Sequence, residues 1–392
     1  MAITINQQPQ QFSTVYNQMI VSCESTNTGQ TDFSYIFEIL DNSATVLRTL
    51  RVPPEVRFTY GVSDVARILE SELGTNFFKN ETIADTIDSS NASFEYEIRI
   101  GEEYDVAGTL TQFLNLASFT AKCINGALSF TNFINYDYTD YELDAPLKKF
   151  LTNDIDKRVI ENQEGYTSFL NNPAPSNFRI LTYDSAGTLL KDATWNNVAT
   201  ADIAQFASAP LSLNAVTLTS GTQPLIQDDT SYYEIFAENS GVVSDRYRYN
   251  IFKTCGEGAV LHFLNDLGGF DWFPFIKIKQ SFTIERNKYK QQPQRLQADG
   301  TYNFNTIDRE IVQYHTKRTE TARLNTDYLT DAEYVWLRQL VDSPEVYLEL
   351  NNVFYSVIIN ANNYDVQEDD YDGMTFLELD IEYSVEGYRQ RF

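Results

Sequence analysis

Short stretches in which apolar and polar residues alternate recur along the whole chain. Residues 94–100 (FEYEIRI) alternate strictly, so one face is apolar and the other charged, as in an antiparallel strand with one solvated face. Similar stretches, rich in aromatic and β-branched residues, lie at 33–40, 178–183, 232–238 and 376–383. The pattern predicts a mainly β, multidomain protein of antiparallel sandwich or barrel units with a few short helices.

Breaks in this pattern divide the chain into three predicted domains. Residues 1–145 read as a β-rich domain with one short helix, for which Ser63 is the expected N-cap. Residues 146–258 contain short strands about ten residues apart, which is typical of an immunoglobulin-like or fibronectin-like sandwich. Residues 259–392 form a third, β-rich domain with one capped helix.

The sharpest local pattern in the third domain is a capping box. Thr330 and Glu333 stand three residues apart at the start of an apolar helical periodicity, so each side chain can bond the backbone N–H of the other. Pro344 disfavours helical conformation in the residue before it. These residues predict a helix over 330–342, followed by a hairpin over 346–359.

Composition and charge narrow the classes of function. The 392 residues include 29 Lys/Arg and 55 Asp/Glu, for a net charge of −26, and 14% are aromatic. That aromatic content provides too much buriable surface for a disordered chain, and the net charge repels a phosphate backbone. No stretch approaches the ~18–20 apolar residues that a spanning helix needs. We therefore expect no membrane insertion and no sequence-specific nucleic-acid binding.

Charge is unevenly distributed along the chain. Residues 277–323 contain 10 Lys/Arg and 5 Asp/Glu, a net charge of +5, whereas residues 327–392 have a net charge of −12. A basic segment beside acidic ones suits the two complementary faces of a head-to-tail assembly, although an uneven solvated surface gives the same counts. The candidate interface cations are Lys288, Lys290, Arg295, Lys317 and Arg318.

A double-glycine turn at 268–269 is followed by four aromatic residues within six positions. Two interpretations are open: an exposed aromatic contact patch, or a hairpin whose aromatic rings fill the core. The first interpretation makes Phe270, Trp272 and Phe273 candidate interface residues, and they would supply the apolar part of the contact.

Residues for catalysis are scarce. His262 lies in an apolar run typical of a core histidine, His315 lies in a strand-like stretch, and no nucleophile elbow accompanies either. The three cysteines, at 23, 123 and 255, are too widely spaced for a zinc site or a disulfide framework, so we expect buried free thiols. The sequence predicts that the protein is not an enzyme and has no cofactor.

The acidic stretch 368–373 partly resembles a calcium-binding loop. It places acidic residues at loop positions 1, 3 and 5 and Gly373 at position 6, as an EF-hand does. Position 12 is Leu379, however, where the bidentate Glu is required, and no helical pattern flanks the segment. An acidic turn between two strands is the simpler interpretation, and no metal site is predicted.

Three segments carry a resemblance to a known group of proteins. The runs 261–271 (LHFLNDLGGFD), 324–337 (LNTDYLTDAEYVWL) and 340–347 (LVDSPEVY) resemble tail-region structural virion proteins of tailed bacteriophages or prophages of Bacteroidota hosts. The N-terminal segment 15–20 with 33–35 is compatible with the same group, whereas the middle domain carries no such resemblance. The resemblance implies an assembly role and carries over no active-site residues.

Under that resemblance we expect a structural component made in the host bacterial cytoplasm and located in the virion tail region. It would form a ring of copies of itself, six or a multiple of six, in the tail, baseplate or neck, and contact other tail or neck proteins. The alternatives are a receptor-recognition module that binds or cleaves glycans, and a capsid decoration protein. Trimeric fibres usually contain repeats or coiled-coil shafts, and this chain contains neither, which favours the ring component.

Overall fold

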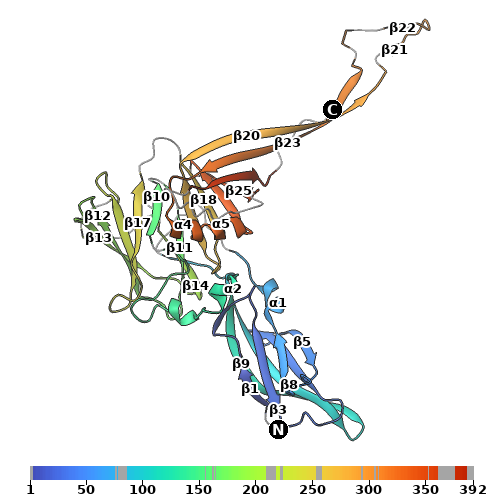
Figure 1. The fold of residues 1–392 in the computed structure, drawn as a ribbon, viewed down its shortest axis with the longest axis vertical. Helices are drawn as coiled ribbons and strands as arrows, with labels where there is room; N and C mark the ends of the chain where they lie inside the picture. Colours follow the sequence, from blue (N-terminus) through green and yellow to red (C-terminus); the bar gives the residue numbers. More distant parts are fainter. Residues whose placement is uncertain are drawn as a thin grey trace. The chain divides into compact units, whose positions relative to one another are not determined.

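The computed structural model describes the following residues: 3–75, 77, 86–154, 156–160, 163, 165–208, 218–220, 224–252, 258–292, 295–303, 306–307, 309–351, 353–360 and 376–385. Within these ranges the chain is mainly β, with several antiparallel sheets and a few short helices (Figure 1). The predicted fold class is confirmed.

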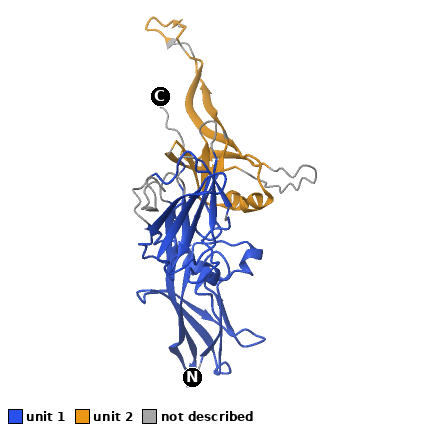
Figure 2. Ribbon diagram, turned by 90° about the vertical axis from the view of Figure 1, so that its left-hand side faces the viewer, with its two compact units in different colours: residues 1–253, 263–273 blue, residues 254–262, 274–392 orange. Residues whose placement is uncertain are grey.

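The chain divides into two compact units, whereas the sequence predicted three domains. Unit 1 comprises residues 1–253 and 263–273, and unit 2 comprises residues 254–262 and 274–392 (Figure 2). Unit 1 therefore contains the first predicted domain and the second up to residue 253. Strand β7 (Thr86–Asp88) links them, because it pairs with β14 (Ile203–Ala207). The two strands are more than 100 residues apart, so their pairing leaves no pattern in the local sequence. A domain boundary predicted at residue 145 from local patterns therefore separates two strands that pair.

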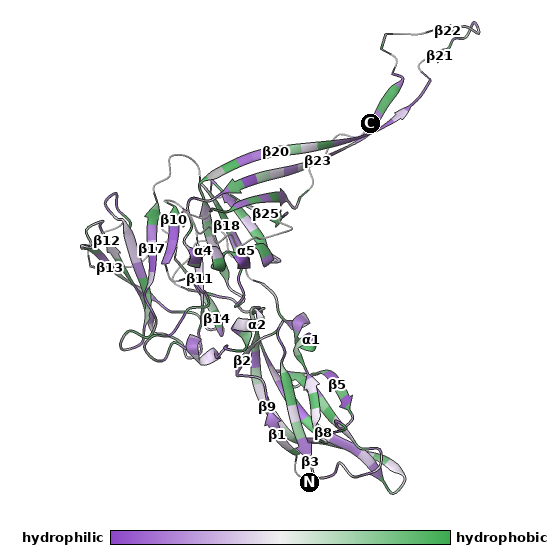
Figure 3. Ribbon diagram, in the orientation of Figure 1, coloured by the Kyte–Doolittle hydropathy of each residue, from purple (hydrophilic) through white to green (hydrophobic). Residues whose placement is uncertain are grey.

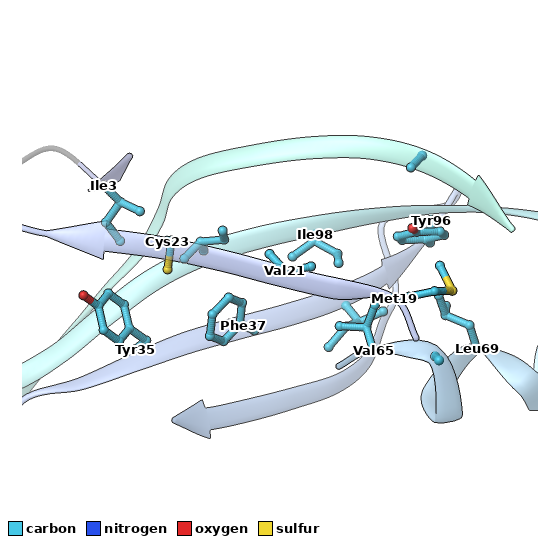
Figure 4. Close-up of a cluster of buried hydrophobic side chains, with 14 of the residues drawn as sticks. Ile3, Met19, Val21, Cys23, Tyr35, Phe37, Val65, Leu69, Tyr96 and Ile98 are labelled. Carbon is cyan, nitrogen blue, oxygen red and sulfur yellow. The ribbon is translucent and has the colours of Figure 1, made fainter. Parts of the chain in front are cut away.

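The N-terminal part of unit 1 contains two sheets, with strand orders β2-β9-β8-β4-β5 and β1-β3-β6. Their strands are β1 (Ile3–Gln7), β2 (Phe12–Thr14), β3 (Ile20–Ser25), β4 (Ser34–Asp41), β5 (Val46–Val52), β6 (Gly61–Asp64), β8 (Ser93–Val106) and β9 (Thr109–Ile124). Side chains from both sheets form one buried cluster (Figure 4). Val21 and Cys23 of β3 meet Tyr35 and Phe37 of β4 there, so the apolar face of each alternating strand turns toward the other sheet.

The predicted helix after residue 63 is only one turn long and begins later than expected. It consists of α1 (Ala66–Leu69) and the 3₁₀ turn η1 (Glu70–Glu72). The prediction of Ser63 as N-cap is wrong, because β6 continues through this residue. Instead, the Asp64 carboxylate accepts a hydrogen bond from the Ala66 N–H at 3.1 Å.

The second part of unit 1 is a sandwich of a six-stranded sheet, β10-β17-β16-β12-β13-β15, and a three-stranded sheet, β11-β14-β7. The remaining strands are β10 (Asp156–Ile160), β11 (Tyr166–Leu170), β12 (Asn177–Tyr183), β13 (Leu189–Asn196), β15 (Leu218–Ser220), β16 (Tyr232–Glu238) and β17 (Tyr247–Phe252). The Phe178 ring of β12 lies 4.8 Å from Phe169 of β11 and 4.5 Å from Phe206 of β14, centroid to centroid. The three rings pack against one another between the two sheets and form part of the core. The short helices α2 (Phe130–Phe133) and η2 (Tyr138–Tyr141) precede the sandwich.

The seven-stranded sheet with the order β19-β18-β24-β25-β26-β23-β20 lies mostly in unit 2, but residues 263–264 of β18 and 270–273 of β19 belong to unit 1. Its strands are β18 (Ala259–Leu264), β19 (Phe270–Phe275), β20 (Lys277–Lys290), β23 (Ile311–Asn325), β24 (Val346–Leu350), β25 (Val353–Ile359) and β26 (Glu378–Tyr383). A two-stranded sheet, β21 (Arg295–Leu296) with β22 (Tyr302–Asn303), lies in the connection between β20 and β23. The predicted hairpin 346–359 is confirmed by the pairing of β24 with β25.

The predicted capping box is present at the start of α4 (Asp331–Trp336), which is followed by α5 (Arg338–Asp342). The Glu333 N–H donates to Thr330 Oγ1 at 3.2 Å, and the Thr330 N–H donates to Glu333 Oε2 at 2.8 Å. The predicted helix 330–342 is therefore two short helices that meet at Leu337.

Replacing Thr330 by Ala should lower the free energy of unfolding of unit 2 by about 0.5–2 kcal/mol, because the Glu333 N–H loses its acceptor. Urea denaturation measures the change, and Thr330→Ser, which keeps the hydroxyl, is the matched control. An unchanged midpoint for Thr330→Ala would contradict a stabilising role for this cap.

Candidate interaction site

Two long strands of unit 2 extend together beyond the rest of their sheet. Strands β20 and β23 pair from Lys277↔Asn325 to Lys290↔Ile311, whereas β26 pairs with β23 only from Thr321 onward. Residues 282–290 and 311–320, termed the ribbon below, therefore pair only with each other within the described part of the chain (Figure 1). At ~3.3 Å per residue, the nine ribbon residues of β20 span about 30 Å.

The ribbon has no core of its own. None of its side chains is buried, and four large apolar ones are exposed: Phe282, Tyr289, Ile311 and Tyr314, at 57%, 47%, 61% and 58%. Along β20 hydrophobic residues stand among hydrophilic ones, whereas β23 is hydrophilic over residues 313–320 (Figure 3). A two-stranded hairpin is at best marginally stable alone in water, and clustered exposed apolar residues usually mark a contact surface.

The register assigns the candidate cations to different faces of the ribbon. Residues directly opposite in an antiparallel pair point to the same side, and neighbours along a strand point to opposite sides. The face that contains Phe282 also contains Ile284, Arg286, Lys288, Lys290, Ile311, Gln313, Thr316, Arg318 and Glu320, and is termed the basic face. Lys317 is directly opposite Glu285 in the register and lies on the other face of the ribbon. Lys317 and Arg318 therefore cannot both contact the same surface of a second molecule.

Several cations of the basic segment are already paired within the chain. The Arg318 guanidinium lies 2.8 Å from Glu320 and 4.5 Å from the centroid of the Phe282 ring. Lys290 lies 2.7 Å from Glu310. Of the four cations on the basic face, Arg286 and Lys288 form no ion pair within the described residues, which makes them the cations of this face most available to a second molecule. The side chain of Arg295 lies outside the described residues.

The aromatic residues that follow the double-glycine turn are core residues. Phe270, Trp272 and Phe273 are only 5%, 1% and 3% exposed, so their prediction as interface residues is wrong and the alternative, a hairpin with core aromatics, is confirmed. All six residues of β19 are buried, because this strand is covered on both faces. These three aromatic residues therefore offer no surface to another molecule, whereas the ribbon exposes apolar side chains.

A buried polar network explains why β19 can contain an aspartate. Lys157 Nζ lies 2.5 Å from Asp271 Oδ1, and both side chains are 1% exposed. Thr152 Oγ1 and Asn265 Nδ2 donate to Asp271 Oδ2 at 2.9 and 3.0 Å. The Asn265 Oδ1 also accepts the N–H of Gly269 at 3.0 Å, which holds the turn before β19. The network is enclosed in the core of unit 1 and stabilises the fold.

The other predicted chemical groups are also structural where they are described. His262 is 3% exposed and its Nε2 lies 2.8 Å from Glu349 Oε2, which confirms a core histidine, whereas His315 is exposed on β23. Cys23 and Cys123 are buried free thiols, as predicted, and burial raises the pKa of each to about 12. Cys255 and the acidic stretch 368–373 lie outside the described residues.

Two further kinds of feature are absent from the described residues. Within the ranges given above, no group of three or more His, Cys, Asp or Glu side chains is placed to hold a metal ion. None of the helices in these ranges has the length and apolar character needed to cross a membrane.

The outer face of the six-stranded sheet carries a pair of tyrosines that could suggest a sugar platform. The rings of Tyr183 and Tyr232 stack with centroids 4.9 Å apart. Arg248 lies 3.8 Å from the centroid of Tyr232, and β16 lies between the strands that carry Tyr183 and Arg248. Both faces of the Tyr232 ring are therefore covered by neighbours in the chain, which leaves no face of it for a sugar.

The geometry thus favours one site, the ribbon, and a docking role for it. No protein-family model and no curated protein matches this chain. Sequence reasoning found the charge of segment 277–323 but not the exposed apolar residues Phe282, Tyr289 and Tyr314 within it. The alternation of 278–284 (IKQSFTI) was the available signal for these long strands.

Proposed function

We propose that this chain is a structural component of a tailed-phage virion that assembles as a ring in the tail, baseplate or neck. The observation that carries the proposal is the ribbon, which has no buried side chain over about 30 Å. Such a ribbon gains order and buries its exposed Phe282, Tyr289 and Tyr314 only when a second molecule covers it.

Charge supports a second copy as the partner. A chain with a net charge of −26 repels its copies, so association is favoured where a positive surface lies in the contact. Segment 277–323, with its net charge of +5, contains the ribbon. A contact between two different surfaces of one chain is heterologous and closes into a ring when the rotation between copies fits.

The position in a virion is proposed from the resemblance. Segment 261–271 forms the end of β18, the turn and the start of β19, and segment 324–347 contains α4, α5 and the start of β24. These are structural elements, as an assembly role requires. Sixfold or multiple-of-six symmetry, contacts with other tail or neck proteins and location in the virion tail region follow from the same resemblance.

The charge of the basic face provides a first test. Reversing Arg286 and Lys288 to Glu should reduce the number of rings in negative-stain images at least tenfold, because acids at these two positions of the basic face then repel the acidic partner surface. Arg48→Glu/Arg67→Glu makes the same charge change at exposed positions of unit 1 and should leave ring numbers unchanged. Undiminished rings in the ribbon variant would remove the basic face from the interface.

A further inference from the structure

Segment 129–147 of unit 1 exposes three large apolar side chains. Phe130, Ile134 and Leu147 are 77%, 61% and 76% exposed. Phe130 and Ile134 are one helical turn apart, and the Ile134 N–H donates to the Phe130 carbonyl at 3.2 Å, so both side chains lie on one face of α2. These residues offer apolar surface to another molecule.

The segment is nevertheless well packed on its inner side. Phe133, Tyr136, Tyr138 and Tyr141 pack against a buried cluster, and the Tyr136 hydroxyl donates to the Phe12 carbonyl at 3.1 Å. The segment therefore has an inner side, where Phe133 and the three tyrosines pack, and an outer side, where Phe130 is exposed. The exposed side chains of Phe130 and Ile134 therefore belong to an ordered surface rather than to a loose loop.

The same segment is acidic. Residues 129–147 contain four acids and no Lys or Arg, and the acids are Asp137, Asp140, Glu142 and Asp144. None of the four forms an ion pair within the described ranges. Burial raises the pKa of Glu142 above its ordinary value and the nearby Asp144 raises it further, while the nearby Lys148 lowers it in part. Lys148 follows the segment, but its ammonium donates to the Thr139 carbonyl.

We infer that the ribbon of one copy docks on segment 129–147 of the next copy. This inference rests on the proposed function and names the partner surface of that contact. Each surface combines exposed apolar side chains with charge: the basic face of the ribbon has Phe282 together with Arg286 and Lys288, and segment 129–147 has Phe130 and Ile134 together with four acids.

The two parts of the contact have different roles. Burial of the apolar side chains provides most of the affinity, while the opposite charges set the register and the rate of association. Because both surfaces belong to every copy, each copy docks on one neighbour and receives another, which is the arrangement that a closed ring requires.

A charge-reversal complementation experiment tests the pairing. Asp140→Lys/Asp144→Lys should reduce ring numbers in negative-stain images at least tenfold, as Arg286→Glu/Lys288→Glu does. A chain that carries all four changes should recover rings to within about threefold of the wild type, because the opposite charges again face each other. Glu24→Lys/Asp229→Lys, at exposed positions elsewhere in unit 1, is the matched control and should leave ring numbers unchanged.

A second variant tests the apolar part without altering charge. Phe130→Ser should also reduce ring numbers at least tenfold. It should leave the melting temperature of the chain within about 2 °C, since surface substitutions cost little stability. A large fall in melting temperature would show that Phe130 is needed for folding and would count against its assignment to a contact surface.

The outcomes separate the inference from the proposed function. If ribbon reversal abolishes rings and segment reversal does not, or if the fourfold variant fails to recover them, this docking site is wrong and the ribbon has another partner surface on its copies. If neither reversal changes ring numbers, or the wild type remains a monomer at every concentration, the proposed function falls together with the inference.

Discussion

Replacing Asp271 by Ala should lower the free energy of unfolding of unit 1 by about 3–5 kcal/mol, the usual cost of breaking a buried ion pair. The change removes the carboxylate that lies 2.5 Å from the Lys157 ammonium, at a place where both side chains are 1% exposed. It also removes the acceptor of Thr152 Oγ1 and of one Asn265 amide N–H. Urea denaturation followed by tryptophan fluorescence measures the loss, because Trp272 lies 4.4 Å from Lys157 Nζ.

Two further variants separate the buried charge from packing. Lys157→Met/Asp271→Leu removes both charges of the pair together and should cost much less than Asp271→Ala, which removes one charge of a buried ion pair. Glu234→Gln alters a half-exposed pair, in which Arg246 lies 3.0 Å away, and should change the free energy by less than about 1 kcal/mol. If the double variant were the least stable of the three, buried charge would not explain the effect.

Local patterns in the sequence were sufficient for much of the fold. The alternation of 94–100 marks the start of β8, and the turn-rich stretch 184–187 separates β12 from β13, which pair as predicted. The Thr330 capping box involves residues only three positions apart, so its geometry is fixed by the helix itself. These elements depend on near neighbours, and near neighbours are visible in a sequence.

The remaining features depend on partners that are distant in the chain. The aromatic run 270–275 is a core strand although it contains Asp271, and the partner of this carboxylate, Lys157, is 114 residues away. Likewise, β10 pairs in parallel with β17, which begins at Tyr247. The basic residues could be counted, but their division between two faces follows from the β20–β23 register and its bulge between Asn287 and Lys288.

Removing the ribbon should abolish assembly and leave the fold intact. Ser281 and Thr321 are directly opposite in the register, and their hydroxyls lie 2.9 Å apart. An Asn-Gly pair can therefore join them as a two-residue hairpin turn in place of residues 282–320. Because no ribbon side chain is buried, the melting temperature should change by no more than about 2 °C.

The molar mass of the intact and shortened chains in solution, measured by light scattering over a range of concentrations, tests the central claim most directly. The intact chain should reach six times its mass of 44.9 kDa, or a multiple of that value, whereas the chain without the ribbon should remain a monomer. Equal masses for the two chains, whether monomeric or assembled, would contradict the claim that the ribbon joins copies of this protein.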